Sequence, residues 1–472
     1  MKNQLKILLE KALQNNCALL FSGGIDSLVL AKLMKGKKLN FECFAIGAEN
    51  SSDLEFAEKQ AEEYGFKLNS KKITEKEIEK KIPELISIIG EINVVKTGVG
   101  LTKFIAIEQA KKRGFKKIAV GSGADELFAG YSKMKTNTEK QSKELIKNYW
   151  QENEYLLKIA ENYGIELIFP YMQKETIEFA SKLKTNQKIN KERNKVILRD
   201  LAKQIGLENY SERKKTAAQY GTKIDRIIEK LAKPNKKTQY LQEQFPLGAL
   251  FSSGKDSCYA MQKMIERGFK FNCLITIESE NPYSYMFHTP AINIAEVQAK
   301  AMELPIIIQK TKGEKEKELK DLETAIKKAK KEFGIKGITT GALYSEYQAS
   351  RIQKICDKLG LVCFNPLWHM DQEQEMREIV KQGYKVMITG IAAYGFDETW
   401  LGKIINENTL KKLKEIESKY KINFAFEGGE AETLVLDAPF FKKKIKIIES
   451  EIQEQDENTA RLIIKKAELK IK

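Results

Sequence analysis

Two six-residue segments of this chain have the residue types that bind phosphate. The first, residues 22–27, reads Ser-Gly-Gly-Ile-Asp-Ser, and the second, residues 252–257, reads Ser-Ser-Gly-Lys-Asp-Ser. Small residues let the backbone approach an anion, and the backbone N–H groups at the start of a helix attract negative charge. Asp26 and Asp256 suit a Mg²⁺ ion. Two ordinary turns between strand and helix would look similar, but the repetition of the pattern favours nucleotide binding.

Both segments resemble the PP-loop of enzymes that cleave ATP between its α and β phosphates. They do not fit the Walker A motif, in which Gly-Lys-Ser/Thr follows a glycine after four residues. The resemblance implies ATP and Mg²⁺ as cofactors, and transfer of AMP to a substrate oxygen with release of pyrophosphate. Asp26 and Asp256 are then the expected metal ligands. The expected ATP-binding residues are Ser22, Gly23, Gly24, Asp26 and Ser27 in the first PP-loop and Ser252, Ser253, Gly254, Lys255 and Ser257 in the second.

The second half carries further motifs, in a fixed order, between residues 246 and 450. They lie at 285–290 (Tyr-Met-Phe-His-Thr-Pro), 298–302, 341–351 (Gly-Ala-Leu-Tyr-Ser-Glu-Tyr-Gln-Ala-Ser-Arg), 356–361, 366–368, 400–402 and 427–439 (Glu-Gly-Gly-Glu-Ala-Glu-Thr-Leu-Val-Leu-Asp-Ala-Pro). This set resembles the diphthine–ammonia ligases, which complete diphthamide on translation elongation factor 2. The resemblance implies amidation of the diphthine carboxylate by ammonia through an acyl-adenylate, with AMP and pyrophosphate as products.

Several side chains in these motifs can act on the reacting groups. Tyr347 and Arg351 lie on one helix face, and Arg351 can clamp a phosphate or carboxylate. Glu430 and Glu432 project from one face if their segment is extended, where they could hold Mg²⁺ or capture ammonium. The alternatives are that Arg351 caps a helix, that Glu430 and Glu432 form a solvated acidic turn, and that His288 is structural. The expected catalytic residues are Asp256, Arg351, Glu430 and Glu432, and the expected substrate-binding residues are His288, Ser345, Tyr347, Gln348 and Glu427.

Three positions depart from the pattern of that family. Ser253 stands where a second glycine is usual, Phe426 where glycine is usual, and Ala431 where an aromatic residue is usual. A Cβ at position 253 is tolerable if that residue does not need a positive φ. Loss of the aromatic ring at 431 is expected to loosen the substrate pocket. Neither the extra Cβ nor the lost ring removes an ionisable group, so these departures weaken the inference of activity without excluding it.

The first half has its own acidic motif, Gly-Ser-Gly-Ala-Asp-Glu-Leu-Phe-Ala-Gly-Tyr at 121–131. Together with the first PP-loop and a basic segment at 211–221, it resembles the synthetase domain of asparagine synthetases. The resemblance implies that Asp26, Asp125 and Glu126 help to hold Mg²⁺-pyrophosphate. Asparagine synthetases that use glutamine begin with a separate glutaminase domain, for which the residues before the first PP-loop leave no room. We therefore expect free ammonia, without a built-in glutaminase, as the nitrogen donor.

These residues need a framework that brings the ends of several strands together. Apolar strand-like runs alternate with amphipathic helical runs, as at 41–46 and 54–64, which is typical of parallel sheets covered by helices. We predict an α/β fold with two PP-loop domains of the adenine-nucleotide-hydrolase (HUP) type. The two PP-loops start 230 positions apart (252 − 22), and a polar stretch with a Pro-Asn breaker precedes the second. The predicted domains are therefore 1–232 and 246–472, joined by a linker at 233–245.

Composition excludes several classes of protein. The 472 residues are 42% hydrophobic and 31% charged, as in soluble globular proteins, and no apolar run approaches a membrane span of about 20 residues. We expect a cytoplasmic protein with no membrane association. The six cysteines contain no Cys-x-x-Cys pair and there are only two histidines, so a zinc or iron–sulfur site is not expected. Buried structural thiols are the preferred interpretation of the cysteines.

The net charge of +16 leaves a second function open. A basic chain with PP-loops fits an ATP-dependent tRNA-modifying enzyme, although the missing Cys-x-x-Cys argues against it. Alternating lysine and glutamate, as at 312–320, fits solvated helix faces instead. We expect elongation factor 2 bearing diphthine as the partner, with no requirement for nucleic acid. A first half that only binds the factor is a further alternative.

Overall fold

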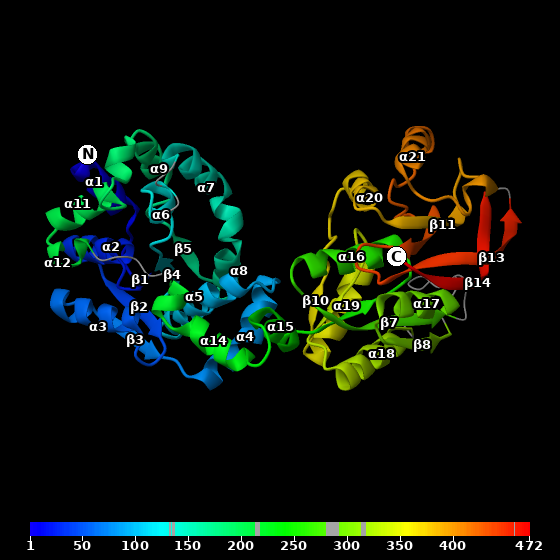
Figure 1. Cartoon of the computed structure of the whole chain (residues 1–472), viewed down its shortest axis with the longest axis horizontal. Helices are drawn as coiled ribbons and strands as arrows, with labels where there is room; N and C mark the ends of the chain where they lie inside the picture. The colour runs from blue at the N-terminus through cyan, green and yellow to red at the C-terminus, as the bar shows by residue number, and fades with distance from the viewer. Residues whose placement is uncertain (132–133, 135–136, 213–217, 280–291, 313–317, 457) are drawn as a thin grey trace. The chain divides into compact units, whose positions relative to one another are not determined.

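The chain forms two compact units in a computed structural model, Met1–Leu241 and Gln242–Lys472 (Figure 1). The structure describes residues 1–131, 134, 137–212, 218–279, 292–312, 318–456 and 458–472. The point that divides the units falls within the expected linker, 233–245, but that stretch also contains helix α15 (Lys237–Gln244). A pattern of polar residues around a Pro-Asn breaker did not predict this helix.

The first unit is built on a five-stranded parallel sheet in the order β3-β2-β1-β4-β5. Its strands are β1 (Cys17–Leu20), β2 (Phe41–Gly47), β3 (Leu68–Lys72), β4 (Lys117–Ala119) and β5 (Glu166–Ile168). Its helices are α1 (Lys2–Ala12), α2 (Ile25–Gly36), α3 (Ser52–Tyr64), α4 (Glu75–Ile89), α5 (Val94–Lys112), α6 (Ala124–Leu127), α7 (Thr138–Glu152), α8 (Glu154–Asn162), α9 (Lys174–Ser181), α10 (Thr185–Lys188), α11 (Val196–Gln204), α12 (Glu208–Ser211), α13 (Ala218–Gly221), α14 (Ile224–Ala232) and α15.

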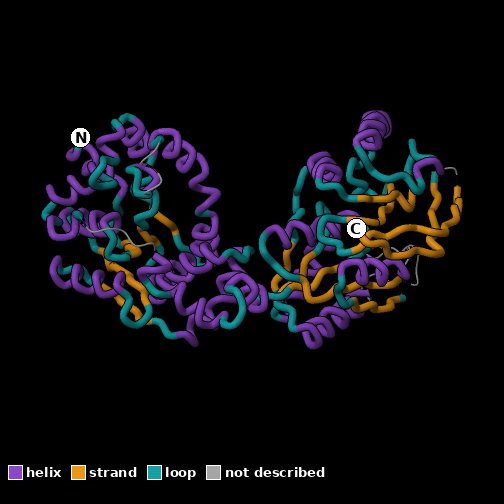
Figure 2. The backbone as a smooth tube through the Cα atoms, in the orientation of Figure 1, coloured by secondary structure: helices purple, strands orange, loops and turns teal. Residues whose placement is uncertain are grey.

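The second unit repeats this sheet in the order β8-β7-β6-β9-β10. Its strands are β6 (Leu247–Leu250), β7 (Phe271–Ser279), β8 (Ile306–Thr311), β9 (Gly337–Thr339) and β10 (Val362–Phe364). The helices of the unit are α16 (Lys255–Glu266), α17 (Ile292–Met302), α18 (Glu318–Phe333), α19 (Glu346–Leu359), α20 (Gln372–Lys381), the short 3₁₀ helix η2 (Glu398–Trp400) and α21 (Glu407–Tyr420). Helices flank the strands of both sheets (Figure 2), and the predicted fold class is confirmed.

A second sheet in this unit was not predicted. It is antiparallel and four-stranded, in the order β12-β11-β14-β13. Its strands are β11 (Lys385–Ala392), β12 (Ala431–Asp437), β13 (Lys443–Asp456) and β14 (Thr459–Ile471). Residues near the middle of β13 alternate charged with apolar and are largely exposed on both faces, so the burial signal expected of a strand is weak there.

Each PP-loop leaves the central strand of its parallel sheet. The first connects β1 to α2 and the second connects β6 to α16, and in each sheet the neighbouring strands run outward in both directions. In open parallel sheets, ligands bind beyond the carboxyl ends of the strands at this switch point. The topology therefore gives both PP-loops the same position in their sheets.

The cysteines lie in the cores of the two units. Five of the six cysteines are buried, the sixth is partly buried, and all are free. Burial raises the pKa of the Cys17 thiol to about 12, as expected for an inert core residue. Within the described ranges no single helix is both long and apolar enough to cross a bilayer; α4 and α5 combine the necessary length and composition only as a pair bent by 104°.

Candidate functional site

The first PP-loop is held by three hydrogen bonds. The backbone N–H of Ser22 donates to Oγ of Ser27 at 3.3 Å, and that hydroxyl donates to the carbonyl of Gly24 at 3.1 Å. The side chain of Gln60, from α3, donates to the carbonyl of Gly23 at 3.0 Å. Gly23 has φ +64°, a conformation that glycine adopts at little cost. The loop is thus fixed before any ligand binds.

The second PP-loop repeats these bonds position by position. Ser252 N–H donates to Ser257 Oγ at 3.3 Å, and that hydroxyl donates to the Gly254 carbonyl at 3.1 Å. Gln298 of α17 donates to the carbonyl of Ser253 at 3.0 Å. Ser253 has φ +69°, so the condition under which its Cβ is tolerated without strain is not met. The left-handed conformation costs a residue with a Cβ about 1 kcal/mol or more.

Strand β12 covers the second PP-loop, and this contact has no counterpart in the sequence prediction. Val435 N–H donates to the carbonyl of Ser253 at 3.1 Å. The N–H of Lys255, the first residue of α16, donates to Oγ1 of Thr433 at 3.2 Å. Gln298 bridges loop and strand, because its amide also donates to the Val435 carbonyl at 2.8 Å. The motif at 427–439 therefore packs directly on the nucleotide-binding motif.

A cluster of ionisable groups lies at the start of α16. The ammonium of Lys255 is buried; it donates to Asp256 and lies 3.8 Å from the carboxyl of Glu375. Burial and the Asp256 charge raise the pKa of Glu427 to about 7, and its carboxylate accepts from the backbone N–H of Tyr344. The structure thus brings the predicted residues Asp256 and Glu427 together.

Glu375 belongs to this cluster but was not predicted from the sequence. It lies on α20, is completely buried, and burial raises its pKa although the Lys255 charge acts in the opposite direction. The carboxyls of Asp256 and Glu375 hold the pKa of Lys255 above its ordinary value against the effect of burial. The Lys255 ammonium therefore contacts carboxyl groups in this structure. Its role in ATP binding stays a prediction.

Glu430 and Glu432 have separate sets of partners. Glu430 Oε1 accepts from the N–H and the side-chain amide of Asn423, both at 2.7 Å, and Oε2 accepts from Gly428 N–H at 2.8 Å. Glu432 pairs with Arg461 of β14 at 3.4 Å. The two carboxylates therefore contact different groups in this structure, and a shared metal or ammonium site stays a prediction. Glu430 fixes its own loop, and the catalytic roles of both residues stay predictions.

The other predicted residues lie at the start of α19. Arg351 stacks on the ring of Tyr347, with its guanidinium carbon 3.4 Å from the ring centroid, so the expected shared face is present. Ser345 caps the helix by accepting from Gln348 N–H at 3.3 Å. Ser345 and Gln348 therefore have a structural role that does not depend on substrate. The predicted residue His288 lies outside the described residues.

The two remaining departures from the family pattern are both buried. Phe426 has φ +66°, and its ring packs on Phe396 with centroids 6.1 Å apart. The position that is usually glycine therefore carries a left-handed aromatic residue, whose burial offsets the backbone strain. Ala431 begins β12 and is buried as well.

The acidic residues predicted for the first unit also meet, around a lysine. The Lys195 ammonium lies 2.6 and 2.7 Å from the two oxygens of Asp26 and 2.7 Å from Asp125 Oδ1. Glu126 accepts from the Tyr131 hydroxyl at 2.8 Å. Burial lowers the pKa of Lys195, with the Asp26 carboxylate acting in the opposite direction. No sequence pattern singled out Lys195.

Magnesium fits these sites only together with a nucleotide. In the described parts of the chain, no three His, Cys, Asp or Glu side chains form a cluster that could hold a metal ion. Mg²⁺ commonly uses one or two carboxylates and takes its other ligands from phosphates and water. Asp256 in the second unit, and Asp26 with Asp125 in the first, supply such hard oxygen ligands at a helix N-terminus.

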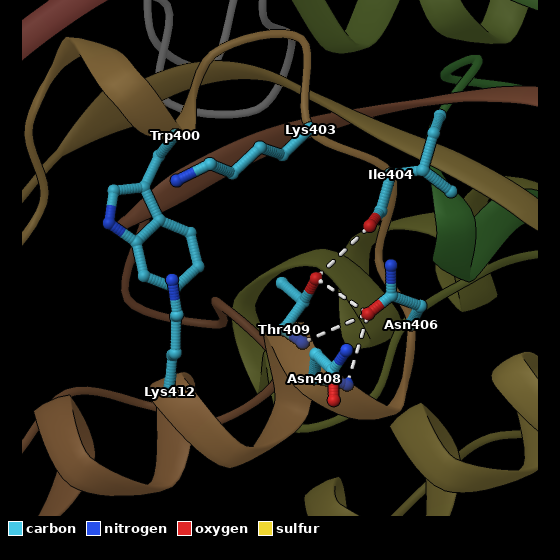
Figure 3. Close-up of a pocket in the computed structure, with 7 residues that line it drawn as sticks. All are labelled: Trp400, Lys403, Ile404, Asn406, Asn408, Thr409 and Lys412. Atoms are coloured by element: carbon cyan, nitrogen blue, oxygen red, sulfur yellow. Dashed lines mark hydrogen bonds between the residues drawn. The ribbon is translucent and has the colours of Figure 1, made fainter.

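A pocket elsewhere in the second unit holds none of the predicted residues (Figure 3). Its polar groups cap helix α21: Asn406 Oδ1 accepts from the N–H groups of Asn408 and Thr409 at 3.0 and 3.1 Å. The pocket is lined by Trp400, Lys403, Ile404, Asn406, Asn408, Thr409 and Lys412. Because these groups serve the helix, the PP-loop and β12 remain the better candidate site.

Comparison with known proteins agrees with the two sets of motifs. Residues 247–363 match the diphthamide synthase N-terminal domain and residues 371–469 the diphthamide synthase C-terminal domain. The diphthine–ammonia ligase of Mus musculus is 34% identical over 224 residues, covering 43% of this chain and 84% of that relative. The chain belongs to the diphthine–ammonia ligase family. The member from Homo sapiens is 33% identical over 225 residues, covering 44% of this chain and 84% of the relative.

The first unit matches a different family. Residues 8–162 and 154–244 match asparagine synthase. In a separate comparison of the whole chain with solved structures, NMN synthetase from Francisella tularensis has 14% identity and a TM-score of 0.27, covering 52% of this chain and 90% of that chain, a likeness that says nothing about either unit. This diphthine–ammonia ligase family member is thus an ATP-dependent carbon–nitrogen ligase fused to an asparagine-synthase unit. The family matches do not favour the RNA-modifying alternative.

Proposed function

We propose that the second unit converts diphthine on translation elongation factor 2 to diphthamide, using ATP and ammonia. The carboxylate oxygen attacks the α-phosphorus, the bond to the β-phosphate oxygen breaks, and pyrophosphate leaves. Ammonia then attacks the carbonyl carbon of the acyl-adenylate, and AMP leaves as the carbon–oxygen bond breaks. The observation that carries this proposal is the contact of β12 with the second PP-loop through Thr433 and Val435, which joins both family domains in one site.

The PP-loop binds the phosphates in this proposal. Ser252 is exposed at the loop surface and Gly254 immediately precedes α16. The buried hydroxyl of Ser257 holds this loop in shape through Ser252 and Gly254. The helix N-terminus favours the negative charge of the departing pyrophosphate. Asp256 would hold Mg²⁺, which neutralises phosphate charge when bound. Arg351 is exposed enough to reach a substrate carboxylate while its guanidinium rests on Tyr347.

Glu427 is the group best suited to take the proton that ammonia loses. It is half-buried, its pKa of about 7 lets it exchange protons at neutral pH, and it lies next to Asp256. A base whose pKa matches the operating pH is the most effective proton acceptor. This role extends the substrate-binding role expected from the sequence. The reaction runs in the cytoplasm, with elongation factor 2 bearing diphthine as partner and free ammonia as nitrogen donor.

The test supplies the full-length chain with diphthine-bearing elongation factor 2, Mg²⁺-ATP and an ammonium salt. The expected result is conversion of the carboxylate to the amide, seen by mass spectrometry of the modified peptide, with one AMP and one pyrophosphate per amide. Release of ADP and phosphate instead would exclude the acyl-adenylate route. No change in mass with folded, ATP-binding protein would overturn the proposal.

A further inference from the structure

In the first unit, the ammonium group of Lys195 lies between the carboxylates of Asp26 and Asp125. Asp26 follows β1 and Asp125 follows β4, and these strands are neighbours in the sheet. The Lys195 ammonium contacts both carboxylates at 2.6–2.7 Å, and its side chain is 1% exposed. The carboxylates are 14% and 9% exposed. This is the edge of the sheet where ligands of parallel α/β folds bind.

The surrounding backbone is shaped for this contact. A Cβ on Gly130 would lie 1.8 Å from Asp125 Oδ1 and 2.6 Å from Cε of Lys195, so only glycine leaves room for both side chains. Lys195 precedes α11 with φ +52°, and its N–H donates to the Phe128 carbonyl at 3.2 Å. The end of the acidic motif therefore holds the lysine in place.

The same oxygens suit a divalent cation. Two carboxylates this close repel each other unless a cation lies between them, and Mg²⁺ binds such oxygens at about 2.0–2.1 Å. An ammonium and a metal ion cannot share this position. If a metal arrived alone, Lys195 would lose its partners while still buried, which is strongly unfavourable. Phosphate groups arriving with the metal would supply replacement anions.

We propose that Lys195 occupies the metal position between Asp26 and Asp125 in the nucleotide-free first unit. Metal binding there requires the lysine to leave these carboxylates, and this happens only when a nucleotide arrives with the metal. The first unit is therefore a second metal–nucleotide site, closed to free divalent ions. This inference concerns the first unit and does not depend on the reaction proposed for the second.

The test measures binding of free Mn²⁺ by electron paramagnetic resonance to the full-length chain. The background variant is Asp256→Asn, which removes the metal ligand proposed for the second unit. Lys195→Met should bind Mn²⁺ about tenfold or more tightly than the background, because one positive charge at contact distance is lost. Lys195→Arg should bind as weakly as the background. Lys188→Met, which removes another buried lysine of the same unit, is the control and should not change Mn²⁺ affinity.

Two further measurements separate the outcomes. Thermal unfolding of Lys195→Met should shift upward with Mn²⁺ more than that of the background, which also tests whether the variant folds. Adding Asp26→Asn to Lys195→Met should abolish the gain. An unchanged or weaker Mn²⁺ affinity in folded Lys195→Met would overturn the proposal. So would loss of Mn²⁺-ATP binding without any gain for the free ion, which would place the lysine on the phosphates alone.

Discussion

The two PP-loops have the same backbone and differ in how their aspartate is neutralised. Both leave the central strand of sheets with matching strand order, and both have the same serine and glutamine hydrogen bonds. In the second unit the buried ammonium beside Asp256 comes from the preceding residue, Lys255. In the first it comes from Lys195, 169 positions after Asp26. A carboxylate at this position requires a cation, and either the loop or a distant segment can provide it.

The cover of the loops differs as well. In both units a glutamine from a helix, Gln60 or Gln298, donates to a carbonyl of the PP-loop. The second PP-loop also forms hydrogen bonds with Thr433 and Val435 of β12. The motif at 427–439 therefore supplies a strand that forms hydrogen bonds with the second PP-loop. The matches to the diphthamide synthase domains also lie in the second unit, and the following variants test the proposal that the amidation takes place there.

The largest expected effect separates the two aspartates. Asp256→Asn should lower amidation by a hundredfold or more, because a charge-assisted metal contact is lost in the transition state. Asp26→Asn should leave amidation largely intact. The measurement is the rate of amide formation by mass spectrometry, with circular dichroism to check folding. A greater loss in folded Asp26→Asn would assign the chemistry to the first unit instead.

Glu427→Gln should remove the proton acceptor proposed for the second unit. Amidation at neutral pH should fall on the order of a hundredfold. In the unchanged protein the rate should rise through pH about 7 as Glu427 loses its proton, and then level off. Because the concentration of free ammonia also increases with pH, the quantity to plot is the rate of the unchanged protein divided by the rate of Glu427→Gln at the same pH. A ratio that does not change with pH would exclude this residue as the base.

The raised pKa of Glu427 also predicts how the free energy of unfolding changes with pH. A carboxyl that is harder to ionise in the folded protein favours folding below its ordinary pKa of 4.5, and this contribution is lost as pH rises to about 7. Urea unfolding of Glu427→Gln should show a smaller decrease in stability over that range. Glu375→Gln is the matched comparison, since burial also raises the pKa of the Glu375 carboxyl.

Thr433→Val should destabilise the second unit alone. It leaves the Lys255 N–H without the acceptor that it has at 3.2 Å, at a cost of about 1–2 kcal/mol. Thr433→Ser keeps the hydroxyl and should recover most of this. The measurement is urea unfolding followed by hydrogen exchange in each unit. Equal losses for valine and serine would mean that the methyl group, and not the hydrogen bond, matters.

The smallest effect tests the left-handed residue of each loop. Ser253→Gly should stabilise the second unit by about 1 kcal/mol by removing strain, whereas Gly23→Ala should destabilise the first by at least as much. A Cβ on Gly23 would lie 3.0 Å from the backbone nitrogen of Ala57, which adds to the cost. Unfolding midpoints of the two units are the readout. A destabilised Ser253→Gly would show that the serine hydroxyl outweighs the strain.

Sequence reasoning recovered what depends on local spacing and sheet order. The PP-loops were found because strand, turn and helix are contiguous, and Asp26 and Asp125 meet because neighbouring parallel strands end at one edge. Lys195 and Glu375 were missed for the opposite reason. Glu375 lies in a run of Gln and Glu that resembles a solvated helix face, yet it is completely buried. Contacts between distant segments leave no mark on local composition.

The spacing of Glu430 and Glu432 did not reveal that the two carboxylates have separate partners. Alternation in an extended segment gives the direction of side chains but not the identity of their partners. The loop that contains Asn423 folds back and provides three donors to Glu430, so this carboxylate stabilises a turn. Likewise, nothing in the identity of Ser253 or Phe426 reveals a positive φ; both had to be observed.

Strand β12 has a mechanical consequence for the second unit. Its first residues follow the Glu427–Glu430 turn, and Thr433 and Val435 further along grip the nucleotide loop. Because side chains of a strand alternate between faces, a slip of one residue would turn Thr433 away from α16. The strand therefore links the turn to the nucleotide loop, and we expect a substrate that binds at the turn to change the affinity of the second unit for ATP.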